Sequence, residues 1–206
     1  MLGGVFILFG KSKQPEVSTS QLNQPTWEDK IPSVSNNKTS AETTKSTSKN
    51  SWQTYDSDKN GFRVKYPENW IYGEGDQGKT SGVAFYIKNG NLNETSFRVE
   101  IVAVADVPEN LNTPEKILAT FDAENKKQSG TVTNYRHNMV TLSGVNALHM
   151  TYNYVIPQTD PPETYISSAY FLSKNGKMYS LLIKAKTSDP SNAKVMEEIV
   201  KTFQFK

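Results

Sequence analysis

The sequence predicts an α+β domain, an antiparallel β-sheet of about 7–8 strands with two docked helices, preceded by a polar segment. From residue 52 onward several runs alternate apolar and polar residues, which is the period of half-buried strands. Asn-Gly and Ser-Gly pairs separate neighbouring runs, as in β-hairpins. Two further segments begin with proline and continue with apolar residues at helical spacing, so they predict the two helices.

Residues 1–13 contain a short apolar run, Gly3 to Gly10, followed by two lysines. The run is shorter than the roughly 20 residues that span a bilayer. It also lacks the preceding basic region and the following cleavage site of a complete signal peptide. We interpret residues 1–13 as the apolar remnant of a signal or anchor segment. Through this segment alone we expect contact with a membrane.

Residues 14–50 are rich in Ser, Thr, Asn and Gln and show no sustained hydrophobic period. Such a composition cannot bury enough apolar surface to offset the entropy lost on ordering. We therefore expect a disordered polar tether, followed by the folded domain at 51–206. This layout is lipoprotein-like and typical of membrane-anchored, extracytoplasmic or cell-surface proteins of the bacterial envelope.

The charge balance argues against one class of partner. Residues 1–50 carry six lysines and four acidic groups, whereas residues 51–206 carry 17 basic and 17 acidic groups. A neutral domain lacks the basic surface that binds phosphate backbones, so we expect no nucleic-acid partner. The chain has no cysteine, which excludes disulfides, thiolate metal sites and a cysteine nucleophile.

Alternation predicts the strands of the first half of the domain. In the segment from Phe62 to Tyr66 apolar and basic residues face opposite sides, and Pro67 ends the run. Three glycines between residues 73 and 78 predict a loop. The predicted strands of this half are 52–55, 62–66, 83–87 and 97–103.

The second half combines hairpins with helices. A helix is predicted to begin at Pro114, capped by Thr113, and the closing helix at Pro190, capped by Asp189. Two hairpins lie between them, with Ser143-Gly144 and Asn175-Gly176 as their turns. Their predicted strands are 131–142, 145–156, 164–174 and 177–186, of which the last two are apolar enough to be central.

The first hairpin also predicts where the two histidines lie. A two-residue turn at Ser143-Gly144 pairs His137 with Met150 and Tyr135 with Tyr152. His137 then falls on the apolar face, in the core or at its edge, and His149 on the solvated face. Because adjacent strand residues point to opposite faces, the two histidines cannot share a metal ion.

At three places the chain resembles the PsbP family, which is named for an extrinsic subunit of photosystem II. The first is the segment from Tyr55 to Trp70, which resembles the opening strand of the family and its Tyr-Pro-x-x-Trp ending. The second is Asn175 to Leu181, which resembles the late hairpin. The third is the closing helix, 190–202, which leads into Phe203-Gln204-Phe205. The resemblance covers residues 52–206, roughly. It implies a PsbP-like α/β sandwich, and it implies photosystem II association only in a photosynthetic context.

One motif predicts a metal site. Asp56, Asp58 and Asn60, followed by Gly61, have the spacing that opens an EF-hand-type calcium loop. The twelfth position, where such a loop needs a bidentate acid, is Pro67. Asp, Asn and Gly are also the residues of a turn between strands, and this interpretation is preferred. Calcium therefore remains a weak candidate, and no cofactor is expected.

The sequence contains no nucleophile elbow, P-loop, dinucleotide fingerprint or HExxH motif. We therefore expect a protein that is not an enzyme and that binds or stabilises an unknown protein partner in the envelope. One alternative is a photosystem II-associated extrinsic subunit that retains calcium or manganese. A second alternative is a carboxylate-based hydrolase of envelope polymers, since carboxylate pairs leave no short motif.

Overall fold

The computed structural model describes residues 51–90, 92, 94–127, 132–156 and 162–206. The proposed anchor and tether, residues 1–50, lie outside the described residues. Within the described ranges the elements are β1 (Trp52–Ser57), β2 (Phe62–Pro67), β3 (Trp70–Gln77), β4 (Thr80–Ile87), β5 (Ser96–Ala103), two 3-10 turns (Val104–Asp106 and Glu109–Leu111), α1 (Pro114–Lys127), β6 (Val132–Leu142), β7 (Val145–Ile156), β8 (Glu163–Lys174), β9 (Lys177–Lys186), α2 (Pro190–Lys201) and β10 (Gln204–Phe205).

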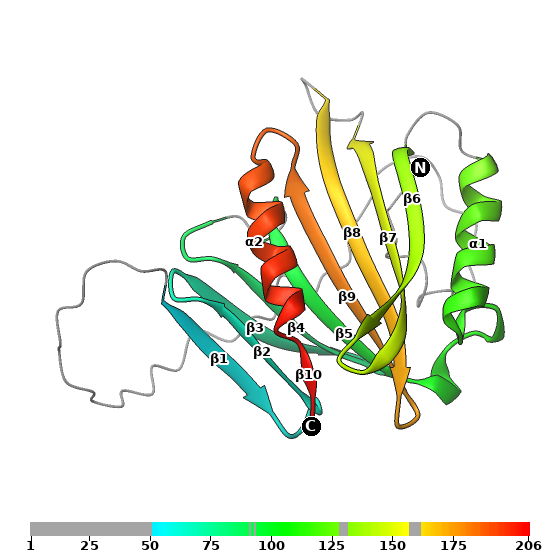
Figure 1. Ribbon diagram of the computed structural model, residues 1–206, viewed down its shortest axis with the longest axis horizontal. Helices are drawn as coiled ribbons and strands as arrows, with labels where there is room; N and C mark the ends of the chain where they lie inside the picture. Colours follow the sequence, from blue (N-terminus) through cyan, green and yellow to red (C-terminus); the bar gives the residue numbers. More distant parts are fainter. Residues whose placement is uncertain (1–50, 91, 93, 128–131, 157–161) are drawn as a thin grey trace, which may run out of the picture.

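The strands form two antiparallel sheets. The large sheet has seven strands in the order β3-β4-β5-β9-β8-β7-β6, which confirms the predicted α+β class and places β9 at the centre (Figure 1). The small sheet has the order β1-β2-β10, and the sequence did not predict that it would be separate. Strand β10 joins it because Gln204 pairs with Arg63 and Phe205 with Phe62.

The segment with three glycines is a strand, not the predicted loop. Strand β3 pairs with β4 along its whole length, with Gly73 opposite Ala84 and Gly75 opposite Gly82. A ladder of backbone hydrogen bonds does not require side chains, so here it overrides the low strand propensity of glycine. The third glycine, Gly78, lies in the turn to β4 with a φ of +60°.

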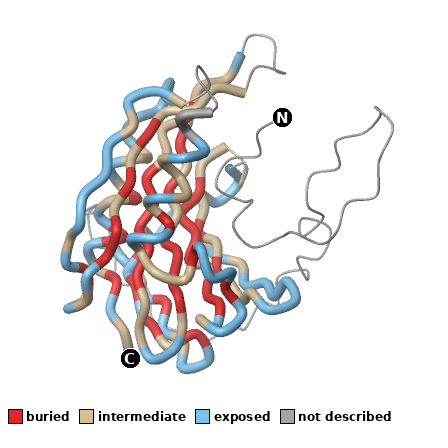
Figure 2. Tube along the Cα trace, turned by 90° about the vertical axis from the view of Figure 1, so that its right-hand side faces the viewer, coloured by how far each residue is buried: buried red, intermediate tan, exposed pale blue. Residues whose placement is uncertain are grey.

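One face of the large sheet is covered by the small sheet and by α2. The inward side chains of β2 are at most 4 % exposed and contact a layer of aromatic residues from both sheets. Phe62 stacks on Phe203 at 5.2 Å between ring centroids and lies 5.3 Å from Tyr55. From α2, Met196, Ile199 and Val200 are buried in the same cluster. These side chains belong to one core cluster that lies under both elements. Figure 2 marks the buried positions of the chain in red.

The opposite face of the large sheet has a smaller core with α1. Ile117 is fully buried there, and Leu118 and Phe121 pack beside it, which confirms the predicted apolar face of this helix. They contact a second cluster that includes Met150 and Phe171. Figure 1 shows α1 near β6 and β7, whereas α2 lies across β9.

The two predicted helix starts are both present but differ in detail. The Thr113 hydroxyl accepts the backbone N–H of Lys116 at 3.3 Å, so it caps α1 as expected. Proline begins α2 as expected, but the Asp189 carboxylate accepts no backbone N–H there. It accepts hydrogen bonds from the Ser191 and Asn192 side chains instead, which satisfies it locally.

Removing the Phe62 ring should destabilise both sheets together, because the ring is fully buried between them. We expect Phe62→Ala to lower the free energy of unfolding by about 3–5 kcal/mol. Urea denaturation followed by tryptophan fluorescence measures the loss. The matched control is Met139→Ala, a residue 49 % exposed on β6, which should change stability by about 0.5 kcal/mol or less. Equal losses in the two variants would contradict this account of the core.

Candidate functional site

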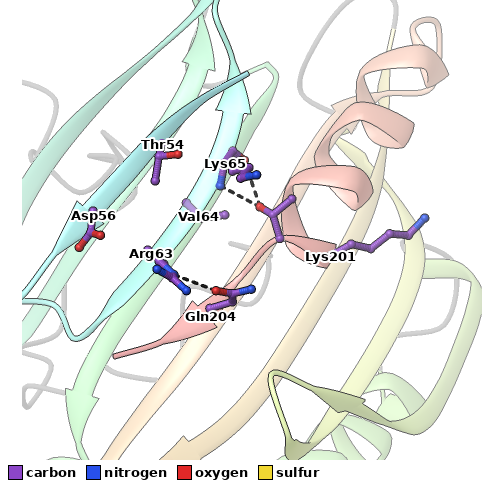
Figure 3. Close-up of a pocket in the computed structure, with 8 residues that line it drawn as sticks. Thr54, Asp56, Arg63, Val64, Lys65, Lys201 and Gln204 are labelled. Carbon is purple, nitrogen blue, oxygen red and sulfur yellow. Dashed lines mark hydrogen bonds between the residues drawn. The ribbon is translucent and has the colours of Figure 1, made fainter. Parts of the chain in front are cut away.

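The outer face of the small sheet carries a polar groove. Because side chains alternate along a strand, burying the inner face of β2 turns Arg63 and Lys65 outward. On β1 the same alternation turns Thr54 and Asp56 outward, directly opposite them in register. This surface, here called the outer groove, has a volume of about 530 Å³ and is shown in Figure 3. It is lined by Thr54, Asp56, Arg63, Val64, Lys65, Lys201, Thr202 and Gln204.

The Arg63 guanidinium is held in place across the floor of the outer groove. Its Nε donates a hydrogen bond to Oε1 of Gln204 at 2.8 Å (Figure 3). Gln204 is the register partner of Arg63 on β10, so the bond joins two neighbouring strands. Since an arginine has five N–H donors, the other donors remain available to a ligand.

Thr202, the residue after α2, forms the wall of the groove beside β2. Its hydroxyl accepts the backbone N–H of Lys65 at 2.8 Å and donates to the carbonyl oxygen of Ile199 at 2.7 Å. Strand β10 is only two residues long and does not reach Lys65. The hydroxyl therefore satisfies a backbone donor at the edge of β2 that would otherwise be unpaired.

The charges of the outer groove are unbalanced. Within the described part of the chain, Arg63 and Lys65 form no ion pair with a carboxylate, and Lys201 pairs with Glu198. The one acidic lining residue, Asp56, is held by the Lys206 ammonium. The groove therefore has two positive side chains with no acidic partner among the described residues, although the domain as a whole is neutral.

The structure places Asp56 near the end of β1, and Asp58 and Asn60 in the turn from β1 to β2. Asp56 and Asp58 both contact the Lys206 ammonium, which lowers the pKa of Asp58 through a hydrogen bond and raises the pKa of Lys206. Asn60 is not with them. Its side chain is buried and donates to the Tyr55 hydroxyl at 2.7 Å. The structure thus brings together two of the three proposed ligands, on either side of an ammonium.

The hairpin register confirms part of the prediction for the histidines. His137 pairs with Met150, and the two histidines lie on opposite faces. Tyr135 does not pair with Tyr152, because the register shifts between Thr133 and Arg136. Both predicted environments were wrong, since His137 is exposed and His149 is half-buried. His137 is on the edge strand β6.

His149 belongs to a polar cluster that the sequence did not predict. Its ring stacks on Tyr170 with centroids 4.1 Å apart, and its Nε2 lies 2.9 Å from the Ser168 hydroxyl. The Tyr170 hydroxyl donates to Glu197 of α2 at 2.6 Å. A serine beside a histidine resembles a nucleophile with its base, but Ser168 is only 4 % exposed. The cluster instead connects the large sheet to α2.

Comparison with solved structures agrees with this fold. The chain is similar to cyanobacterial PsbP (CyanoP) from Synechocystis sp. PCC 6803, with a TM-score of 0.52 and 15 % sequence identity. The match covers 80 % of this chain and 98 % of that one. It is also similar to LpqN, involved in cell envelope biogenesis of Mycobacterium tuberculosis, with a TM-score of 0.45 and 13 % identity over 75 % of this chain and 91 % of that one. No curated protein matches the sequence.

The fold and its two-layer core thus define a PsbP-like domain. The family of PsbP-like proteins matches residues 27–205, so the chain belongs to this family, as its sequence motifs predicted. Neither helix described in the structure is long and apolar enough to cross a membrane. Across the same described residues, no three His, Cys, Asp or Glu side chains are grouped to hold a metal ion.

The environment of His149 predicts a pH dependence of stability. Burial lowers the pKa of this imidazole, and the nearby Glu197 carboxylate opposes the shift in part. The unfolded chain therefore takes up the proton first, so stability falls as pH decreases below about 6.5 and is unaffected by this group above it. NMR titration of the imidazole resonances measures the pKa. A value at or above about 6.5 for His149 would contradict the prediction.

The variants His149→Gln and His137→Gln form a matched pair for this titration, because the chain has two histidines. Each variant assigns one imidazole resonance. His149→Gln should lose stability less steeply than the wild type between about pH 7 and pH 5, since the buried titrating group is gone. His137→Gln, changed at an exposed position, should keep the contribution of His149 to this dependence.

Proposed function

We propose that this PsbP-like protein is a non-enzymatic binding module that contacts a protein partner outside the cytoplasm, held to the membrane by its N-terminal segment. The observation that carries the proposal is the outer groove, an open polar surface whose floor is fixed by Arg63 and Gln204. A held guanidinium and two cations without acidic partners are features of a recognition surface. The pairing of β1 and β10 with β2 places the lining side chains of the groove, and we propose that binding needs no cofactor.

The proposed location is supported by the sequence before the domain. The apolar run at 3–10 and the polar stretch at 14–50 give the order of anchor, tether and domain. A tether of about 37 residues has an r.m.s. span on the order of 30–35 Å, enough to hold the domain clear of an envelope surface. The outer groove begins at β1, immediately after this tether in the chain.

The alternative of a carboxylate-based hydrolase has less support from the geometry. Glycoside hydrolysis by carboxylates needs two acidic side chains that flank one cleft. The outer groove is lined by one acid, Asp56, and that carboxylate is paired with Lys206. A second, shallower groove beside α1 is likewise lined by one acid, Glu109. A protein-binding role, unlike a hydrolase, would use the two cations, Arg63 and Lys65, that the outer groove presents.

Photo-crosslinking in cells of the native source tests the proposed function. A photoreactive amino acid at position 54 replaces a groove-lining threonine, and the same amino acid at position 88 replaces an exposed lysine in the turn after β4. We expect a discrete protein adduct from position 54 and none from position 88. The absence of an adduct at position 54, or the same adducts from both positions, would reject the outer groove as the binding surface.

Protease treatment of intact cells, followed by membrane fractionation, tests the proposed location. We expect the protein in the membrane fraction, with the domain released from outside by cleavage within residues 14–50. Protein that is soluble and protected in intact cells would reject the anchor, the tether and the extracytoplasmic role together. The crosslinking result at position 54 would still stand, since it reports on the surface and not on the compartment.

Calcium retention, the second candidate function, is opposed by the contacts of its proposed ligands, because Asp56 and Asp58 already hold one cation between them. That cation is the Lys206 ammonium, and Asn60 points into the core, so the wild type should give no heat with calcium at about 1 mM. Lys206→Gln frees both carboxylates and should allow weak binding, with a Kd in the range of about 10⁻⁴–10⁻³ M. Calorimetry measures both. Tight binding by the wild type would instead favour the calcium-retaining, photosystem II-associated alternative.

A further inference from the structure

We infer that the outer groove binds the carboxylates of an extended acidic segment of the partner protein, an inference that rests on the proposed function. The groove presents two cations, Arg63 and Lys65, that form no ion pair within the described residues. Charge complementarity therefore selects a negatively charged ligand. The spacing of these two side chains indicates that the ligand is an extended peptide.

The spacing of the two cations matches an extended chain. Arg63 and Lys65 are two residues apart on β2, so their side chains leave the same face roughly 6.5–7 Å apart along the strand. In an extended peptide, alternate side chains have the same spacing. A segment with acidic residues at alternate positions can therefore place one carboxylate at each cation without changing its backbone conformation.

The Arg63 side chain is prepared for a carboxylate before the ligand arrives. Gln204 accepts a hydrogen bond from its Nε at 2.8 Å, which restrains one edge of the planar guanidinium. A carboxylate that accepts two N–H groups from such a plane is bound more strongly and more specifically than by a free ammonium. Thr54, which lies opposite Lys65 in register, adds a hydroxyl donor to the same floor. The site therefore provides hydrogen-bond geometry as well as charge.

Two other occupants fit the charges less well. The chain's own residues 1–50 precede β1, but they carry six lysines against four acids and are not complementary to a cationic groove. A long polyanion such as nucleic acid would also meet Asp56, which lines the groove, and Glu198, which pairs with Lys201 beside it. Because acidic side chains border Arg63 and Lys65, a short acidic segment fits between them better than a long polyanion does.

Fluorescence anisotropy with the full-length protein tests this inference. The probe is a short labelled peptide with glutamate at alternate positions and threonine between them, at low ionic strength. We expect Arg63→Gln and Lys65→Gln each to weaken binding about tenfold, the order of effect for one charge-assisted hydrogen bond. Arg63→Lys keeps the charge but loses the planar fork, so it should weaken binding as well.

The matched controls are Lys88→Gln and Lys194→Gln, each of which removes one positive charge from an exposed position outside the groove. Both should bind the peptide as the wild type does. A similar loss in these controls would show non-specific charge attraction and overturn the inference. Two further results would overturn the inference. One is that a peptide with the same glutamates in one block binds as tightly as the alternating peptide. The other is that inorganic polyphosphate, at equal charge concentration, displaces the labelled peptide.

The crosslinking experiment separates this inference from the proposed function. If Arg63→Gln and Lys65→Gln abolish the adduct at position 54, the partner uses the cations and the inference holds. If the adduct persists in both variants, the binding module stands and the acidic-segment inference is wrong. If the wild type gives no adduct, the proposed function fails, whatever the peptide does. Urea denaturation shows that each variant is folded.

Discussion

The burial of one face of β2 is the constraint on which the rest of the domain depends. Phe62, Val64 and Tyr66 are almost completely enclosed between the two sheets, where the rings of Phe62 and Tyr66 join an aromatic layer. Because strand side chains alternate, this burial leaves Arg63 and Lys65 no position except the outer face. The cations of the outer groove are thus fixed by the packing of the core, and a shift of β2 by one residue would bury both charges at a large cost.

The same constraint explains why the end of the chain completes the groove. Phe203 must reach the Phe62 ring, so α2 ends at Lys201 and the chain turns inward at once. The residues on either side of Phe203 then face outward beside β2: Thr202 bonds to the backbone of Lys65, and Gln204 bonds to Arg63. A core contact across 141 residues of sequence therefore also assembles the polar site.

Local signals in the sequence predicted most of the elements but not the way distant ones combine. The Asn175-Gly176 and Ser143-Gly144 turns and the period of each strand depend on neighbouring residues, and they gave bounds close to those observed. Asp56 and Asp58 were identified as a pair, but their partner Lys206 lies about 150 residues away. The separate small sheet and the His149–Tyr170–Glu197 contacts likewise join segments with no local signature.

The neutrality of the domain decides how the outer groove can work. With 17 basic and 17 acidic groups in residues 51–206, the domain has no net charge that would draw a charged partner from a distance. Exposed charges are also screened over about 8 Å at physiological ionic strength. Arg63 and Lys65 can therefore act only on a ligand already at the surface, where the orientation set by Gln204 counts for more than net charge. The proposed tether would offset a weak contact of this kind, because holding the domain near a partner raises the effective concentration.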